Sequence, residues 1–239
     1  MNFAENEYEH PITFTQTGNP SRDFAVACAS YEADLSDKLP ADCNAKVLDI
    51  GCGWGQFLWF LRQKGYTTLQ GIDLGSRQVE FCRSKQFEAE QCANPVSYLD
   101  EREKTYDLVT MHHVIEHMSP EDGLRLLRAI RTALKPGGRA IVQTPNMSAV
   151  SAVFCRFIEI SHCTGYSESN LHQLMGLAGF DGLHVFGSRT PRIKTLKRGL
   201  WVLLQKVERS WWRAMLIAEL GTDAPKILSK NLYISGTKP

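Results

Sequence analysis

The chain has 239 residues, with 27 Lys and Arg against 26 Asp and Glu, for a formal net charge of +1. This length suits one large domain, and the balanced charge argues against a nucleic-acid partner. No segment approaches the ~20 apolar residues of a membrane span. The polar N-terminus lacks the apolar core of a signal peptide, and the seven cysteines form no CxxC pair. Together these features predict a cytoplasmic protein with reduced thiols.

The pattern along the chain predicts an N-terminal arm and helix over 1–45, followed by alternating strands and helices. The expected strands are 46–50, 68–73, 96–99, 107–111, 139–144, 182–187 and 232–237. The expected helices between them are 55–64, 76–86, 120–135 and 168–178. Repeated units of this length predict a doubly wound α/β sheet of mostly parallel strands with helices on both faces. A ligand would then lie beyond the carboxyl ends of the strands.

The first strand runs into a turn with glycines at alternate positions, Gly51, Gly53 and Gly55. Glycines so placed let a ligand lie directly against the backbone where a strand becomes a helix. In the dinucleotide-binding fingerprint G-x-G-x-x-G the third glycine comes one residue later, so the spacing here differs from that motif. Asp73 closes the next strand about twenty residues on, where a carboxylate can accept both ribose hydroxyls. With no GxxxxGK[ST] loop in the sequence, nucleoside triphosphate chemistry is not expected.

Four blocks follow in order over residues 46–146, namely VLDIGCGWG, GIDLG, YDLVTMHHVIEHM and ALKPGGRAIVQTPN. In this combination the sequence resembles the class I S-adenosylmethionine-dependent methyltransferases. The resemblance implies a Rossmann-like seven-stranded sheet whose last strand runs antiparallel between its neighbours. It also implies S-adenosyl-L-methionine as cofactor, with S-adenosyl-L-homocysteine as its product. Residues 46–146 would form the cofactor-binding half of one methyltransferase domain, and 147–239 the acceptor side.

The resemblance also assigns the cofactor contacts. Asp49 and His112 would lie near the methionine part, Asp73 would hold the ribose, Leu74 would flank the adenine, and Leu99-Asp100 would border its edge. Because a sulfonium is cationic, acids are its expected neighbours. The complete expected set is Asp49, Gly51, Cys52, Gly53, Gly55, Asp73, Leu74, Leu99, Asp100 and His112.

Methyl transfer requires an aligned nucleophile and often a group that removes its proton. Histidine suits this role near neutral pH. The segment after the fourth strand carries His113, Glu116 and His117, and the connection after the fifth strand carries His162. We expect His117 and His162 to be the candidates for the base, with Glu116 as the orienting group and His113 beside them. The alternative is that each histidine only lines the pocket.

Residues 113–117 also match H-x-x-E-H, a zinc-binding pattern that requires a helix. Here the pattern follows a strand directly and stops at Pro120, so no metal is expected. No Asn-Pro-Pro-aromatic motif follows the fifth strand, which favours oxygen over nucleobase or amide nitrogen as the methyl acceptor.

Residues 144–146, 159–162, 166–171 and 179–180 resemble the branch of the family that acts on sugars of bacterial surface polysaccharides. This second resemblance implies O-methylation of a sugar in a lipopolysaccharide or O-antigen glycan. Two alternatives remain at this point. One is an O-methyltransferase for a quinone-like small molecule, and the other is a cofactor-binding scaffold without turnover.

The insertion 189–230 carries apolar residues at steps of three and four, which predicts an amphipathic helix. They are Ile193, Leu196, Leu200, Leu203, Leu204, Val207, Trp211, Met215 and Ala218. Cations accompany them at Arg189, Arg192, Lys194, Lys197, Arg198, Lys206, Arg209 and Arg213. One interpretation is peripheral contact of 189–218 with an anionic membrane surface, such as the inner membrane. The other is a helix packed on the domain or in a homodimer interface.

Overall fold

The computed structural model describes residues 20–191 and 195–239, with side chains described from Asp23 onward. The arm expected over 1–19 lies outside these residues. So do Arg192, Ile193 and Lys194, which the sequence analysis assigned to the amphipathic helix.

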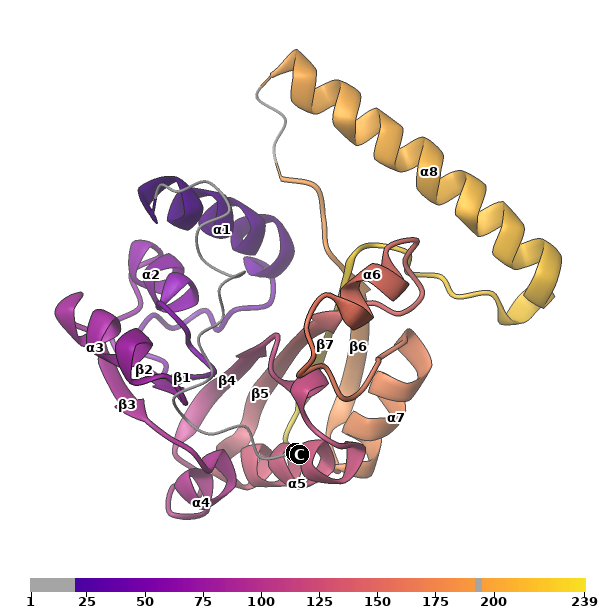
Figure 1. The fold of residues 1–239 in the computed structure, drawn as a ribbon. Helices are drawn as coiled ribbons and strands as arrows, with labels where there is room; N and C mark the ends of the chain where they lie inside the picture. The colour runs from indigo at the N-terminus through magenta and orange to yellow at the C-terminus, as the bar shows by residue number, and fades with distance from the viewer. Residues whose placement is uncertain (1–19, 192–194) are drawn as a thin grey trace.

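A mixed sheet of seven strands forms the centre of the fold, in the order β3-β2-β1-β4-β5-β7-β6 (Figure 1). Its strands are β1 (Val47–Ile50), β2 (Leu69–Asp73), β3 (Glu88–Gln91), β4 (Tyr106–His112), β5 (Leu134–Pro145), β6 (Asp181–Gly187) and β7 (Asn231–Thr237). Strands β1 to β5 pair in parallel, whereas β7 runs antiparallel to both β5 and β6. The Rossmann-like architecture expected from the sequence is confirmed.

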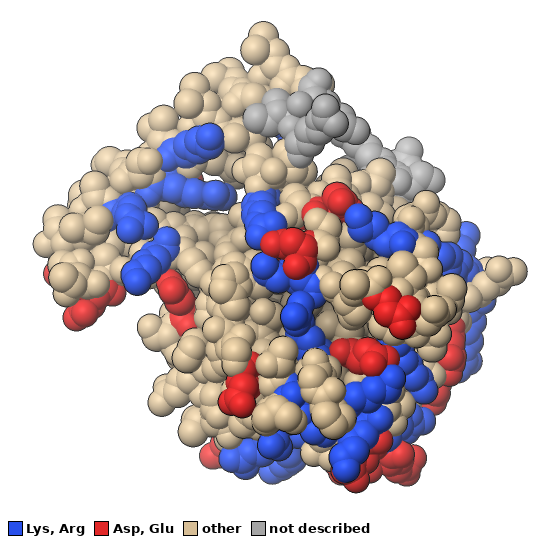
Figure 2. Space-filling view, turned by 180° about the vertical axis from the view of Figure 1, so that it is seen from behind, with Lys and Arg blue, Asp and Glu red and all other residues tan. Residues whose placement is uncertain are grey.

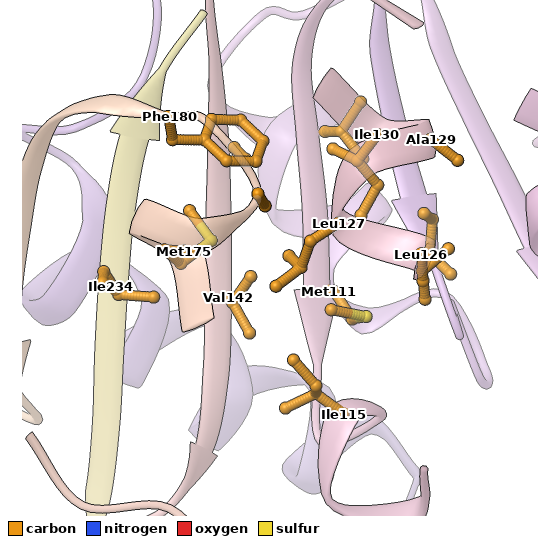
Figure 3. Packing of buried hydrophobic residues seen from close by; sticks show 14 of the residues in the cluster. Met111, Ile115, Leu126, Leu127, Ala129, Ile130, Val142, Met175, Phe180 and Ile234 are labelled. Atoms are coloured by element: carbon orange, nitrogen blue, oxygen red, sulfur yellow. The ribbon is translucent and has the colours of Figure 1, made fainter. Parts of the chain in front are cut away.

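Helices cover both faces of this sheet. They are α1 (Pro20–Leu35), α2 (Gln56–Gln63), α3 (Ser76–Ser84), α4 (Pro95–Asp100), α5 (Pro120–Ala133), α6 (Ala152–Phe157), α7 (Glu168–Leu177) and α8 (Leu196–Leu220), with 3-10 turns η2 (Ile115–His117) and η3 (Gly221–Asp223). Successive strand residues point to opposite faces, so Val47 joins the core beneath α1 to α3 and Leu48 the core beneath α5 and α7. Figure 3 shows the second core, where sheet residues meet Leu127, Ile130 and Met175.

The strand expected at 96–99 is wrong. The structure places β3 at Glu88–Gln91 and helix α4 at Pro95–Asp100. The Asn94 side chain caps α4 by accepting hydrogen bonds from the Val96 and Ser97 N–H groups, and Pro95 occupies the first turn. Strand β3 lies at the sheet edge with three exposed residues, so it lacks the apolar run by which buried strands are recognised.

The two long connections carry helices α6 and α8. Helix α6 lies in the 146–167 connection, and α8 is the 25-residue amphipathic helix expected in the 189–230 insertion. Figure 1 shows α8 standing off from the body of the protein. Among the described residues, no helix is both long and apolar enough to cross a membrane.

A buried carboxylate attaches α1 to the far side of the sheet. Asp34 is 2% exposed, and its Oδ2 accepts a hydrogen bond from the Tyr233 hydroxyl of β7 at 2.9 Å. Its Oδ1 accepts the backbone N–H of Arg189, where the insertion begins. Burial raises the pKa of Asp34 despite these hydrogen bonds. Asp34 therefore joins α1, β7 and the base of the insertion.

We expect Asp34→Ala to destabilise the protein by about 2–3 kcal/mol, because it leaves the Tyr233 hydroxyl and the Arg189 backbone N–H without their buried acceptor. Urea denaturation measures this loss. Asp37→Ala is the matched control, since Asp37 forms an ion pair with the same Arg189 but its side chain is 47% exposed. That exposed pair should contribute about 0–1 kcal/mol. Equal losses in the two variants would contradict the role given to Asp34.

Candidate active site

A cavity of about 590 Å³ opens at the carboxyl ends of the central strands. Residues at or just after the ends of β1 to β5 line it, among them Gly51 after β1, Leu74 after β2, His113 after β4 and Pro145 at the end of β5. This is the position predicted from the sheet topology.

The glycine turn leaves bare backbone on the cavity wall. Gly51 has φ +70, and a Cβ there would come within 2.3 Å of Val114 Cγ2. Gly53 has φ +50, and a Cβ there would meet nothing within 4 Å. Both lie in the left-handed region, which glycine adopts without strain. The Cys52 side chain is buried behind the turn, where Gly71 makes room for its sulfur.

Asp73 is held rigidly at the end of β2. Its Oδ2 accepts a hydrogen bond from the Gly53 N–H at 2.7 Å, and its Oδ1 accepts one from the Gly75 N–H at 2.9 Å. The neighbouring Leu74 also lines the cavity. The carboxylate is thereby fixed beside the glycine turn before any ligand binds.

Asp49 is an acid on the floor of the cavity, 2% exposed. Its Oδ1 accepts a hydrogen bond from the Thr110 hydroxyl of β4 at 2.8 Å. Burial, with a smaller contribution from Asp73, raises the pKa of Asp49 to about 7, against the opposing effect of the Thr110 hydrogen bond. A cation placed beside it would favour its charged form.

His112 presents a neutral imidazole to the same cavity. Its Nδ1 lies 2.9 Å from Gln143 Oε1, so Nδ1 carries the proton and Nε2 the lone pair. Burial lowers the pKa of His112 to about 4, although the Gln143 hydrogen bond acts in the opposite direction. The Nε2 atom of His112 is buried and has no hydrogen-bond partner among the described residues.

These groups fit the expected sulfonium cofactor. Asp49 and Asp73 supply negative charge, His112 stays neutral, and the glycine turn leaves backbone accessible. The two expected adenine-edge residues do not join them: Leu99 is buried in the core under α5, and Asp100 is exposed at the end of α4. Because β3 ends earlier than expected, the residues that line this part of the cavity are Cys92, Ala93 and Pro95.

His117 heads a chain of hydrogen bonds on the other side of the cavity. Its Nδ1 lies 3.0 Å from Ser161 Oγ, and the Ser161 hydroxyl donates to Glu159 Oε1 at 2.5 Å. Since the single hydroxyl proton goes to Glu159, His117 Nδ1 must be the donor to Ser161. In the neutral ring Nε2 is therefore the basic nitrogen.

His162 packs edge-on against His117, with ring centroids 4.8 Å apart. Its Nδ1 donates to the Cys155 carbonyl at 2.8 Å, and its Nε2 lies 3.9 Å from Glu159 Oε2. The structure thus brings together the two histidines that the sequence singled out from separate segments.

Glu116 lies behind His117 and is buried. Burial pushes its pKa up, but the hydrogen bond and charge of His113 and the charge of His117 outweigh that effect, so the pKa is lowered. The Nδ1 atom of His113 lies 3.0 Å from Glu116 Oε1. The backbone of His113 is strained, with φ +56 in the left-handed region. Glu116 Oε2 is buried and has no hydrogen-bond partner among the described residues.

The H-x-x-E-H pattern does not form the helix that a zinc site of that type requires, because only residues 115–117 form a 3-10 turn. A different set of ligand atoms does converge. Glu116, His117 and His162 each offer one atom, all within 4.8 Å of one another. These three groups could serve proton transfer or hold a cation.

Several lining residues were not anticipated from the sequence. Tyr31 of α1 packs its ring on Phe57 and His112 at centroid distances of 5.1 and 5.2 Å. Phe154 and Ile158 reach the cavity from α6 and its end. Nothing in their local sequence marks them, because contacts between distant elements bring them to the site.

A family model described as "Methyltransferase domain" matches residues 22–185. The ubiquinone biosynthesis O-methyltransferase of Idiomarina loihiensis is 28% identical over 133 residues, 54% of this chain and 53% of that protein. The enzyme of the same name from Acinetobacter baylyi is 35% identical over 116 residues, 46% of this chain and 47% of its own. The chain therefore spans about half the length of these relatives.

Solved structures share the fold. A SAM-dependent methyltransferase from Archaeoglobus fulgidus superposes with a TM-score of 0.61 at 22% identity, covering 81% of this chain and 86% of its own. The Haemonchus contortus phosphoethanolamine N-methyltransferase 2, solved with S-adenosyl-L-methionine, has a TM-score of 0.61 at 17% identity, covering 90% of this chain and 52% of its own. At these identities the likeness concerns the fold alone.

We expect the affinity for S-adenosyl-L-methionine to weaken about tenfold between pH 7 and about pH 5.5, because a proton on Asp49 must leave before the cation binds. Isothermal titration calorimetry measures this change. In that range the cofactor's own α-amino group, with a pKa of about 7.7–8.0, stays charged. Asp49→Asn should bind S-adenosyl-L-methionine weakly, with an affinity that no longer depends on pH in this range. If the affinity of Asp49→Asn fell with pH as steeply as that of wild type, Asp49 would not be the group that titrates.

The same variant gives an independent control on the ligand-free protein. The pKa of Asp49 in the folded protein, about 7, lies above the ordinary value of about 3.9 for an aspartate in an unfolded chain. Its contribution to stability is therefore complete below pH ~4 and is lost as pH rises through about 7. Asp49→Asn should accordingly melt at a higher temperature than wild type at pH 8, with little difference at pH 4.

Proposed function

The chain belongs to the family of class I S-adenosylmethionine-dependent methyltransferase domains, and on that premise we propose that it transfers the methyl group of S-adenosyl-L-methionine to a hydroxyl oxygen of a small, largely apolar acceptor. One observation carries this proposal. The cavity joins an acidic half, built on Asp49 and Asp73, to a histidine whose basic nitrogen is set by Ser161 and Glu159.

The acceptor side of the cavity favours an aromatic or other apolar molecule over a sugar. Met118, Pro145, Phe154 and Ile158 line it. Relatives named for ubiquinone biosynthesis support the same choice. The polysaccharide sugar expected from residues 144–180 has no support among the similar proteins reported above. Glu159, part of that resemblance, is occupied in orienting Ser161.

When bound, S-adenosyl-L-methionine supplies a methyl group activated by its sulfonium. Asp49 and Asp73 would hold the cofactor by charge and hydrogen bonding, with His112 as an uncharged acceptor beside them. His117 Nε2 would take the proton of the acceptor hydroxyl, whose oxygen would receive the methyl group that the cofactor supplies. Glu159, acting through Ser161, and Glu116 stabilise the resulting imidazolium. His162 positions the hydroxyl against His117. The proton then leaves to water.

A cofactor-binding scaffold without turnover is the competing function. Incubation with methyl-labelled cofactor and fractionated lipid, quinone and glycan extracts distinguishes the two. Label in a small phenolic compound supports the proposal, whereas label in glycan supports the sugar alternative. Label in no fraction, from a protein that binds S-adenosyl-L-homocysteine, supports the scaffold. Asp73→Ala should abolish that binding, because it removes the anchored carboxylate.

We expect His117→Ala to lower kcat by about 10²–10⁴, the usual contribution of a general base, with little change in cofactor affinity. Ser161→Ala should lower kcat less and move the acid limb of the pH–rate profile to lower pH, because the protonated ring loses its link to Glu159. Steady-state kinetics over pH measure both effects. His172→Ala, on exposed surface of α7, is the matched control. Near-normal turnover in both His117→Ala and His162→Ala would remove histidine as the base.

A chelator separates proton transfer from metal catalysis at the same three residues. If His117 acts as a base, dialysis against EDTA leaves turnover unchanged. Loss of turnover that a divalent cation restores would instead assign Glu116, His117 and His162 to a metal site.

A further inference from the structure

The exposed face of α8 is too apolar for a surface that stays in water. It carries Leu200, Leu203, Leu204, Val207, Trp211 and Met215, all at least half exposed. At about 3.6 residues per turn these side chains fall on one stripe, which we term the apolar stripe. Val202 and Trp212 lie on the other side of the helix, where Val202 is buried. The stripe thus faces away from the domain, and exposed patches of this kind mark contact surfaces.

The charge around the stripe indicates what covers it. Helix α8 carries five cations and two acids, and Figure 2 shows Lys and Arg along this projecting helix. By helical geometry Lys197 falls on one margin of the stripe and Lys206 lies beyond the other margin, whereas Arg213 is on the face toward the domain, where it donates to the Lys226 carbonyl. An apolar stripe that contains Trp211, has Lys197 on one margin with Trp201 beyond it, and belongs to a helix with an excess of cations matches a helix that lies in the headgroup region of an anionic bilayer.

A second copy of the chain fits the stripe less well. In a two-fold symmetric dimer the same surface meets itself, so the net positive charge of one α8 would come close to that of the other. Phospholipid headgroups of negative charge instead neutralise this charge. Lysine stems can also extend along the apolar surface with the ammonium group at the headgroups.

The segment that lines the acceptor side of the cavity is connected to this helix. The Trp212 Nε1–H donates to the Ser148 carbonyl at 3.1 Å, which places α8 next to the segment that leads into α6. Helix α6 and the residues after it also expose apolar side chains, with Phe157 75% and Ile160 86% exposed. Phe154 and Ile158 of the same segment line the cavity. The segment that contacts α8 therefore carries exposed apolar side chains and also supplies two residues of the acceptor side.

We propose that α8 docks the protein on an anionic membrane surface, and that the acceptor is an amphiphile drawn from that membrane along α6. The second part rests on the proposed function. The first does not, because docking depends only on α8.

Vesicle flotation tests the docking, with phosphatidylcholine alone or mixed with phosphatidylglycerol. We expect binding to the mixed vesicles alone, weakened by salt. Lys197→Glu/Lys206→Glu should weaken it by roughly twentyfold or more, since each cation near an anionic surface contributes about fivefold. Lys104→Glu/Arg125→Glu makes the same charge change at exposed sites remote from α8 and should bind as wild type does.

A triple variant of the exposed stripe, Leu203→Gln/Val207→Gln/Trp211→Gln, should abolish flotation without lowering the melting temperature. The membrane proposal is overturned if wild type does not float on anionic vesicles. A wild-type dimer in light scattering that becomes a monomer in the triple variant would assign the stripe to a second copy.

A two-acceptor assay tests delivery. A phenol with a long apolar chain is supplied in anionic vesicles, and its short-chain analogue in solution. Lys197→Glu/Lys206→Glu should lose turnover with the vesicle-borne acceptor and keep it with the soluble one. If this double variant kept wild-type turnover with both the vesicle-borne and the soluble acceptor, delivery from the membrane would be overturned. Methylation of neither acceptor by wild type that still floats would overturn the proposed function and leave docking intact.

Discussion

The site depends on one constraint, the hydrogen bonds from the Gly53 and Gly75 N–H groups to the Asp73 carboxylate. They tie the turn after β1 to the turn after β2, so the bare backbone and the acid are presented together. The Asp49–Thr110 hydrogen bond similarly joins β1 to β4 below them. Because parallel pairing already holds these strands in register, the acidic half of the cavity is formed before a ligand arrives. This arrangement has a cost, because burial of Asp49 and, to a smaller extent, the neighbouring Asp73 carboxylate raise the pKa of Asp49.

The acidic half is also the part that the sequence predicts best. Asp49, the glycine turn and Asp73 lie within a few residues of strand ends, so local pattern and sheet topology together locate them. Leu99 and Asp100 were misplaced because β3, an exposed edge strand, has no apolar run to reveal it. The Asn94-Pro95 helix start was the readable signal for the correct boundary.

The acceptor half is less predictable for a physical reason. Its residues come from α1, the η2 turn and the α6 segment, which meet only through tertiary packing. Sequence reasoning could select His117 and His162 by residue type and place after a strand. It could not find the Ser161 link or the Tyr31 contact with His112, because neither has a fixed spacing along the chain. The strained backbone of His113 likewise becomes visible only in three dimensions.

The insertion that carries α8 begins and ends at neighbouring strands, since Gly187 of β6 pairs with Leu232 of β7. Chain entering and leaving at adjacent points can change length at little entropic cost to the rest of the fold. The segment is therefore modular: a short hairpin could replace it while the sheet register and the methyl-donor site stay in place. If α8 docks the protein on a membrane as proposed, a single insertion or deletion event at this hairpin would add or remove the docking surface without changing the methyl-donor site.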